Sequence, residues 1–146
     1  MKTAFRTLLA VVAGMALAFA LVVAVEFFSS VVHPFPAGFD GNIPEHVRRY
    51  PQWVLGVVVL MWGATAAAAT WVASRIGGRL AGALVTLLLA LALAFNLSML
   101  PYVMWFKIAM PAAFFLACLL GIRYSRRVPS AAGEDARARW ARDGAD

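Results

Sequence analysis

Residues 52–100 read QWVLGVVVLMWGATAAAATWVASRIGGRLAGALVTLLLALALAFNLSML, and this stretch decides the fold. It contains two apolar runs, at about residues 52–74 and 80–100, separated by a short basic and glycine-rich turn at residues 75–79. A helix of about 20 apolar residues is long enough to cross a bilayer. Each run therefore predicts one span, and the tight turn predicts that the two helices are antiparallel neighbours.

Two further apolar runs flank this pair. The first covers about residues 7–29 and has no charged side chain between Leu8 and Val25. The last covers about residues 101–124 and contains Pro111, after which too few residues remain for a separate span, so we expect one helix kinked near this proline. The sequence thus predicts an all-α polytopic membrane protein, an up-down bundle of four transmembrane helices.

The first run also has features of a secretory signal peptide. Its start is basic, and Ala18-Phe19-Ala20 resembles a cleavage site. The apolar run continues beyond that site to Phe28, which is longer than the apolar region of an ordinary signal peptide. We therefore expect the run to stay in the protein as a helix.

The composition of the chain indicates that lipid, and not water, surrounds most of the protein surface. Hydrophobic residues make up 63% and charged residues 14% of the chain, whereas soluble domains carry about 25% charged residues. The net charge of +6 would suit nucleic acid, but the basic residues lie at the ends of the apolar runs, as in membrane proteins. We therefore expect the lipid bilayer as a partner and no nucleic acid.

The remaining segments divide the chain into a membrane domain and a tail. Residues 30–51 form the one sizeable loop, where closely spaced prolines exclude a long helix and allow a short helical turn at 45–50. Residues 1–127 then form a four-helix transmembrane domain, and residues 128–146, including Trp140, form a flexible, polar cytoplasmic tail.

The distribution of positive charge predicts the orientation. Four spans place both termini on one side, which then carries most of the Lys and Arg residues. Because cytoplasmic segments are enriched in these residues, we predict a multi-pass protein of the bacterial inner membrane with both termini in the cytoplasm and the 30–51 loop outside. The residues on the cytoplasmic side are Lys2, Arg6, Arg75, Arg79, Arg123, Arg126, Arg127, Arg137, Arg139 and Arg142, and those opposite are Arg48, Arg49 and Lys107.

Small residues recur at helical spacing in all four runs and predict the packing seams, because helices in lipid associate through close backbone approach. The seams expected in the four runs are, in chain order, Ala10, Gly14 and Ala18; Gly56, Gly63, Ala67, Thr70 and Ser74; Ala90 and Ala94; and Ala109, Ala113, Ala117 and Gly121.

Four polar residues near the outer ends of the helices form the candidate site. Glu26 and Asn96 lie at similar heights in the first and third helices, Lys107 lies about six residues into the fourth, and His33 follows Glu26 on the same helical face. Three interpretations stay open: a polar pocket that binds a cation or proton, a structural clasp in which Glu26 pairs with Asn96 or Lys107, and side chains that simply reach the interface.

No pattern in the sequence indicates a metal, a cofactor or a known catalytic motif. The acidic residues and histidines of the loop have a spacing that matches no recognised metal site, and Cys118 is the only cysteine, so it has no disulfide partner within the chain. No P-loop, serine elbow or HExxH motif is present. We therefore expect no catalytic residue, no cofactor and no bound metal.

The order of features resembles that of a known group of proteins. A first helix ends in Glu26 before His33-Pro34-Phe35-Pro36-Ala37-Gly38, a second carries Trp62-Gly63 and leaves through Ala73-Ser74-Arg75-Ile76, and a third carries Asn96 before Pro101 and Trp105-Phe106. This order resembles a group of small, uncharacterised bacterial four-helix inner-membrane proteins. The resemblance covers about residues 5–125 and implies no activity.

Three functions are compatible with the sequence. The first is a non-enzymatic structural or accessory subunit of the inner membrane, with a second copy of the chain or another membrane protein as its partner. The second is a small transporter, or an ion- or proton-binding protein, that uses the polar cluster around Glu26. The third is a membrane enzyme that uses Glu26 and His33.

Overall fold

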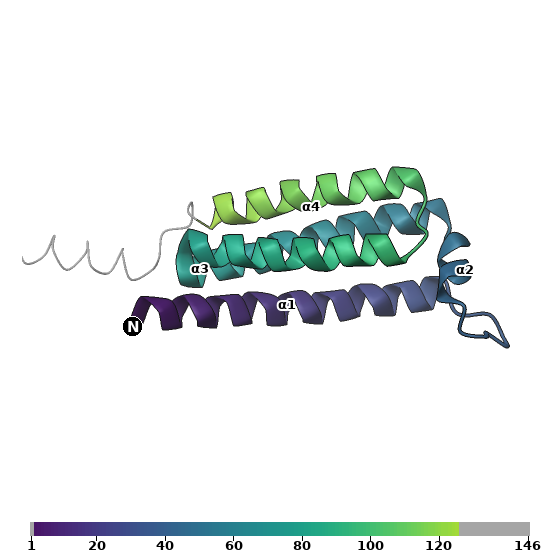
Figure 1. Cartoon of the computed structure of the whole chain (residues 1–146), viewed down its shortest axis with the longest axis horizontal. Helices are drawn as coiled ribbons and strands as arrows, with labels where there is room; N and C mark the ends of the chain where they lie inside the picture. Colours follow the sequence, from purple (N-terminus) through teal and green to yellow (C-terminus); the bar gives the residue numbers. More distant parts are fainter. Residues whose placement is uncertain (1, 126–146) are drawn as a thin grey trace, which may run out of the picture.

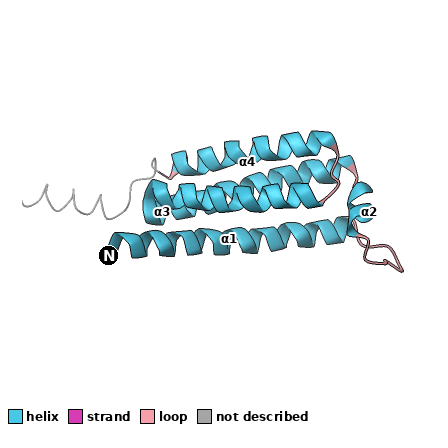
Figure 2. Ribbon diagram, in the orientation of Figure 1, coloured by secondary structure: helices cyan, strands magenta, loops and turns pink. Residues whose placement is uncertain are grey.

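The computed structural model describes residues 2–125, which form helices joined by short loops and contain no strand (Figure 2). The elements are α1 (Lys2–Val32), α2 (Ile43–Arg48), α3 (Gln52–Met99) and α4 (Met104–Tyr124). The predicted all-α class is therefore confirmed. The expected cytoplasmic tail lies outside the described residues. Residues 2–125 form an elongated bundle (Figure 1).

Helix α3 is folded back on itself at Gly78. This residue has φ 79° and ψ −170°, a conformation that is accessible essentially only to glycine. The ribbon of α3 reverses direction there (Figure 1), and the far ends of its two arms meet again, since Leu55 and Val58 line the same cavity as Leu93. The two arms, residues 52–77 and 79–99, thus run antiparallel, at the point where the sequence placed its tight turn.

The exterior of the bundle is apolar. Helices α1, α3 and α4 are each long and apolar enough to cross a membrane. Large hydrophobic side chains point outward from all of them: Phe19 is 73% exposed, Leu60 is 72% exposed and Leu119 is 66% exposed. Such a surface is unsuited to water, and the prediction of a multi-pass membrane protein is confirmed to that extent.

The helix ends differ from the predicted ones: α1 begins at Lys2 instead of at about residue 7, and prolines explain the differences at the other ends. Helix α1 continues to Val32, beyond the predicted end at 29, and stops just before Pro34. Leu100 is extended, with φ −109° and ψ 138°, because the residue before a proline avoids the helical region. Helix α3 therefore ends at Met99, and α4 begins at Met104 instead of directly at Pro101.

The first predicted packing seam is correct. Ala10, Gly14 and Ala18 are all buried, and α1 lies against both arms of α3. A Cβ atom on Gly14 would lie 3.0 Å from the carbonyl oxygen of Ala69 and 3.1 Å from Cγ2 of Val85. Because these two residues belong to different arms, the glycine lets α1 approach the whole hairpin closely.

The predicted seams in the last two runs are correct only in part, because Ala90, Ala113 and Ala117 pack against the core but larger side chains form most of it. Ala94 is exposed and Ala90 only half-buried, whereas Leu89 and Leu93 of the same arm are buried. The expected small residues of α4 are likewise half-buried, except for the buried Gly121. The buried core along these runs consists of larger side chains: Val85, Leu89 and Leu93 in α3, and Phe106, Met110, Phe114 and Cys118 in α4.

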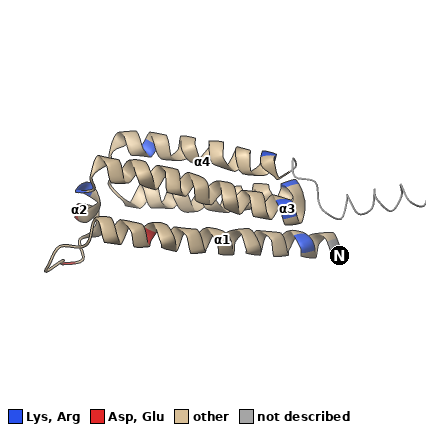
Figure 3. Cartoon of the chain, turned by 180° about the vertical axis from the view of Figure 1, so that it is seen from behind, with Lys and Arg blue, Asp and Glu red and all other residues tan. Residues whose placement is uncertain are grey.

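One end of the bundle, which we call the basic end, contains Arg6, Arg75, Arg79 and Arg123 (Figure 3). Two of these arginines connect the helix ends there through hydrogen bonds. Nε of Arg6 donates a hydrogen bond to the carbonyl oxygen of Ile76 at 2.5 Å, and Nη1 of Arg75 donates one to the carbonyl oxygen of Ser125 at 3.3 Å. These bonds connect α1 and the C-terminus of α4 to the α3 turn. We call the opposite end, where α2 lies, the loop end.

Candidate functional site

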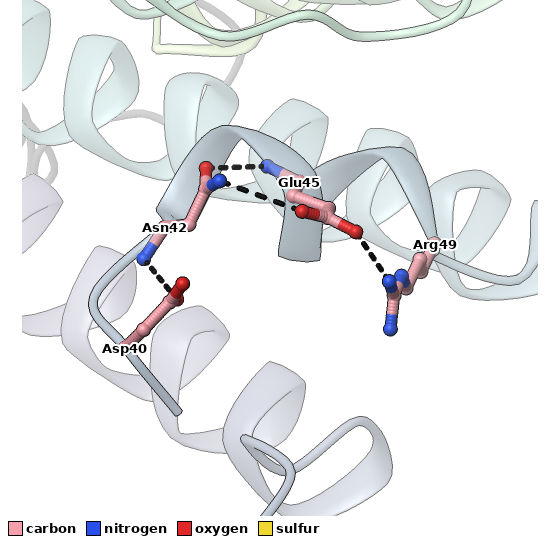
Figure 4. Close-up of polar contacts among 4 residues, drawn as sticks. All are labelled: Asp40, Asn42, Glu45 and Arg49. Atoms are coloured by element: carbon pink, nitrogen blue, oxygen red, sulfur yellow. Dashed lines mark hydrogen bonds and ion pairs between the residues drawn. The ribbon is translucent and has the colours of Figure 1, made fainter. Parts of the chain in front are cut away.

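A short, well-capped helix lies across the loop end of the bundle. The side-chain oxygen of Asn42 accepts a hydrogen bond from the backbone N–H of Glu45 at 3.2 Å, and the backbone N–H of Asn42 itself donates to Asp40 at 3.0 Å (Figure 4). Glu45 is also paired with Arg49 one turn later. This capping explains why α2 begins at Ile43, with Pro44 in its first turn, instead of at residue 45 as predicted.

Aromatic rings pack α2 against the end of α1. The rings of His33 and His46 are stacked, with centroids 4.5 Å apart. Phe35 lies 4.5 Å from His46, and Tyr50 lies 4.7 Å from His33, measured between ring centroids. His46 is buried, so this cluster is a small second core that anchors the loop.

Burial and the neighbouring charges keep His46 neutral. Its pKa is lowered from the usual value of 6.5, first by burial, then by the adjacent His33 and by Arg49, against an opposing effect of the His33 backbone. Nε2 of His33 is also buried and has no hydrogen-bond partner among the described residues. Protonation of His46 would therefore disturb the packing of this cluster.

A cavity of about 270 Å³ lies below α2, between the end of α1, both arms of α3 and the start of α4. Its walls are mostly apolar and include Trp62 and Phe106. Polar side chains reach it from four different segments, and these are Glu26, Ser29, His46, Tyr50, Asn96 and Tyr102.

The carboxylate of Glu26 contributes to a raised pKa of both tyrosines that line this cavity. Burial raises the pKa of Tyr102 to about 12, and the negative charges of Glu26 and Tyr50 add to the rise. Burial and Glu26 also raise the pKa of Tyr50, while a side-chain hydrogen bond with Ser29 opposes this rise. Both phenols therefore stay protonated at neutral pH and remain O–H donors in the cavity that Glu26 also lines.

The structure brings together two of the four candidate residues. Glu26 and Asn96 line the same cavity, as their similar heights in the helices suggested. His33 lies above them and lines a separate hollow next to Asp40 and Glu45. Lys107 is half-buried and lines neither space.

The polar contacts expected for a clasp are absent from residues 2–125. Glu26 forms no ion pair with Lys107 there, because the one ion pair in this range joins Glu45 and Arg49. No hydrogen bond joins Glu26 to Asn96 either. The carboxylate is exposed at the edge of the cavity, which leaves it accessible to a ligand.

The sequence reasoning missed Tyr50 and Tyr102 as site residues. Tyrosines near the ends of membrane-spanning helices are common at the aromatic boundary of the membrane, so neither residue pointed to a site by its type alone. Their positions next to Pro51 and Pro101 gave a signal, because each proline fixes the chain just where it enters or leaves α3. The structure places both tyrosines at the cavity that Glu26 also lines.

The lining of the cavity contains one carboxylate, that of Glu26, and one histidine, His46. Among the described residues, no group of three or more His, Cys, Asp or Glu side chains is placed to hold a metal ion.

Comparison of the chain with known protein families, with curated proteins and with solved structures gave no match. The resemblance to a bacterial inner-membrane group therefore stays a prediction.

Proposed function

We propose that the chain is a multi-pass protein of the bacterial inner membrane that crosses the bilayer four times and acts as a non-enzymatic accessory subunit. The apolar exterior of all the long helices carries this proposal. A straight helix with the 48 residues of α3 would be about 72 Å long, more than twice the thickness of the hydrocarbon layer of about 30 Å. Because α3 folds back at Gly78, each of its two arms has a length that suits one crossing of the bilayer.

The orientation follows from the charges at the two ends of the bundle. The basic end gathers Arg6, Arg75, Arg79 and Arg123, and the positive-inside rule places such an end in the cytoplasm. The loop end, with α2 and the cavity, then faces outward. The exposed apolar faces suit lipid and a protein partner within the membrane, either a second copy of the chain or another membrane protein.

The orientation can be tested with a reporter fused after Asp146. We expect a reporter that is active only in the cytoplasm, such as a fluorescent protein that folds there, to be active in this fusion. A reporter that is active only after export should be inactive at the same position. The opposite pattern would contradict four crossings with a cytoplasmic N-terminus.

The cavity favours a second candidate function, binding of an ion or proton at Glu26. An ionisable side chain near the membrane is costly unless it has a partner or a task. Glu26 has no cationic partner among residues 2–125, and it faces the cavity together with Asn96 and Tyr102. We propose that the carboxylate takes its counter-ion from solution.

This candidate can be tested in proteoliposomes. We expect Glu26→Gln to abolish cation- or proton-dependent flux, since glutamine keeps the shape and hydrogen-bonding capacity but not the charge. Asp40→Asn is the matched control, because it removes one negative charge from the same end of the bundle without touching the cavity. Equal flux through the wild-type protein and Glu26→Gln would remove this function.

A further inference from the structure

We propose that the loop-end cavity binds a small organic ammonium ion, with the Glu26 carboxylate as its counter-ion and the surrounding aromatic rings as its walls. This inference rests on the second candidate function and specifies its ligand. It combines the charge of the cavity, its size and the chemistry of its lining.

The charge of the cavity selects a cation. Among residues 2–125, Glu26 is the only acidic residue that lines it, and no Lys or Arg of this range does so. His46 is the one other ionisable base at the wall, and its lowered pKa keeps it neutral at pH 7. The lining therefore presents one uncompensated negative charge.

The size of the cavity selects a molecule over a bare ion. Its volume is about 270 Å³. It lies just below the range of about 300–1,000 Å³ that is typical of small-molecule pockets. A compact organic ligand fills such a space, whereas a single metal ion does not.

The lining also disfavours a hard inorganic cation. Ca²⁺ takes six to eight oxygen ligands, usually with several carboxylates, and the described residues contain no cluster of this kind. The walls instead carry aromatic rings from four segments, and an ammonium group over such ring faces is attracted by their quadrupoles. These four rings are Tyr50, Trp62, Tyr102 and Phe106, and Phe35 and the neutral imidazole of His46 also line the cavity.

The position of the cavity gives the ligand a route of entry. Glu26 is exposed, and α2 covers the cavity with His46 and Val47. The ligand would enter from the outer aqueous layer, place its charged nitrogen at Glu26 and direct its apolar part toward Leu93 and Met110.

Binding can be measured by equilibrium dialysis of the full-length protein in detergent micelles with tritiated choline. We expect saturable binding of one choline per chain. Its uncharged carbon isostere, dimethylbutanol, has the same shape without the positive charge. We expect it to compete at least about tenfold more weakly, because it gains nothing from Glu26.

Two pairs of variants locate the site. Glu26→Gln should weaken choline binding by about tenfold or more, and Asp40→Asn should leave it unchanged. Tyr102→Leu should weaken binding by about three- to tenfold through loss of the ring face, whereas Tyr102→Phe should retain it. The tyrosine pair keeps the test decisive if Glu26→Gln fails to fold, as judged by circular dichroism and gel filtration.

The outcomes separate this inference from the function on which it rests. Equal competition by dimethylbutanol would overturn the ammonium ligand and indicate a site for neutral molecules. Absence of choline binding, with flux that still depends on Glu26, would refute the ammonium ligand but leave ion binding in place. Absence of both effects would refute both proposals.

Discussion

At the scale of single residues, side-chain size at the helix contacts decides how closely the helices pack. Gly121 shows this most clearly, because a Cβ atom there would lie 2.5 Å from the carbonyl oxygen of Ala67 and would also collide with Thr70. Gly56, in contrast, has no atom within 4 Å of such a Cβ atom. Both glycines belonged to predicted seams, yet only one of them is needed for contact.

We therefore expect Gly121→Ala to lower the free energy of unfolding by about 1–3 kcal/mol, because the added methyl group forces α4 away from α3. Gly56→Ala should be neutral or stabilising by up to about 1 kcal/mol, because alanine favours the helix. The apparent Tm of both purified variants in one detergent measures the difference. Equal melting temperatures would contradict the close α3–α4 contact.

Residue spacing predicted the height of the candidate residues better than their direction. A rise of about 1.5 Å per residue placed Glu26 and Asn96 at one level, and both line the cavity. Lys107 lies in α4 but does not line the cavity, because its direction depends on where α4 begins. The extended segment before Met104 sets that start, and its length could not be read from the sequence.

At the scale of elements, α2 depends on its neighbours for stability. A helix of six residues does not form alone in water. Here Asn42 caps its first turn and His46 stacks on His33. The sequence indicated a helical turn near this position, but the stacking could not be predicted because it joins residues on either side of the loop.

The stability of α2 should decrease as the pH falls below about 6.5. Above that value His46 is neutral in the folded and unfolded chain alike. Because burial lowers the pKa of folded His46, the unfolded state takes up the proton first as the pH falls from 6.5 toward the folded pKa. The stabilising contribution of neutral, stacked His46 is therefore lost in that window.

Hydrogen exchange, corrected for intrinsic rates, can follow this loss in residues 43–48. We expect weaker protection at about pH 5.5 than at about pH 7.5. His46→Phe keeps an aromatic ring without the titrating group, so its protection should vary much less. Equal pH dependence in both proteins would assign the effect to other groups.

At the scale of the whole molecule, the lengths of the apolar runs and one glycine determine the architecture. Apolar length alone predicted the long helices, since few charged residues interrupt them. The reversal at Gly78 was also predictable, because paired glycines between two arginines stop an apolar run. The partner that covers the exposed faces has no such signature, since lipid and protein contacts select the same apolar side chains.

Single-cysteine labelling tests how the whole molecule lies in the membrane. Native Cys118 is only 1% exposed, so the wild-type protein should react little with a membrane-impermeant maleimide. Ala37→Cys lies in the exposed loop and should react in intact cells. Arg79→Cys, next to the α3 turn, should react only after the membrane is permeabilised.

This pair of sites is informative because residue 37 lies at the loop end and residue 79 lies at the turn between the two arms of α3. If α3 crosses the membrane twice, its turn must lie on the side opposite to residue 37, together with the N-terminus and Ser125. Labelling of both cysteines in intact cells would mean that α3 does not span the bilayer. Labelling of Arg79→Cys alone would mean that the basic end faces outward, against the charge rule that orients most membrane proteins.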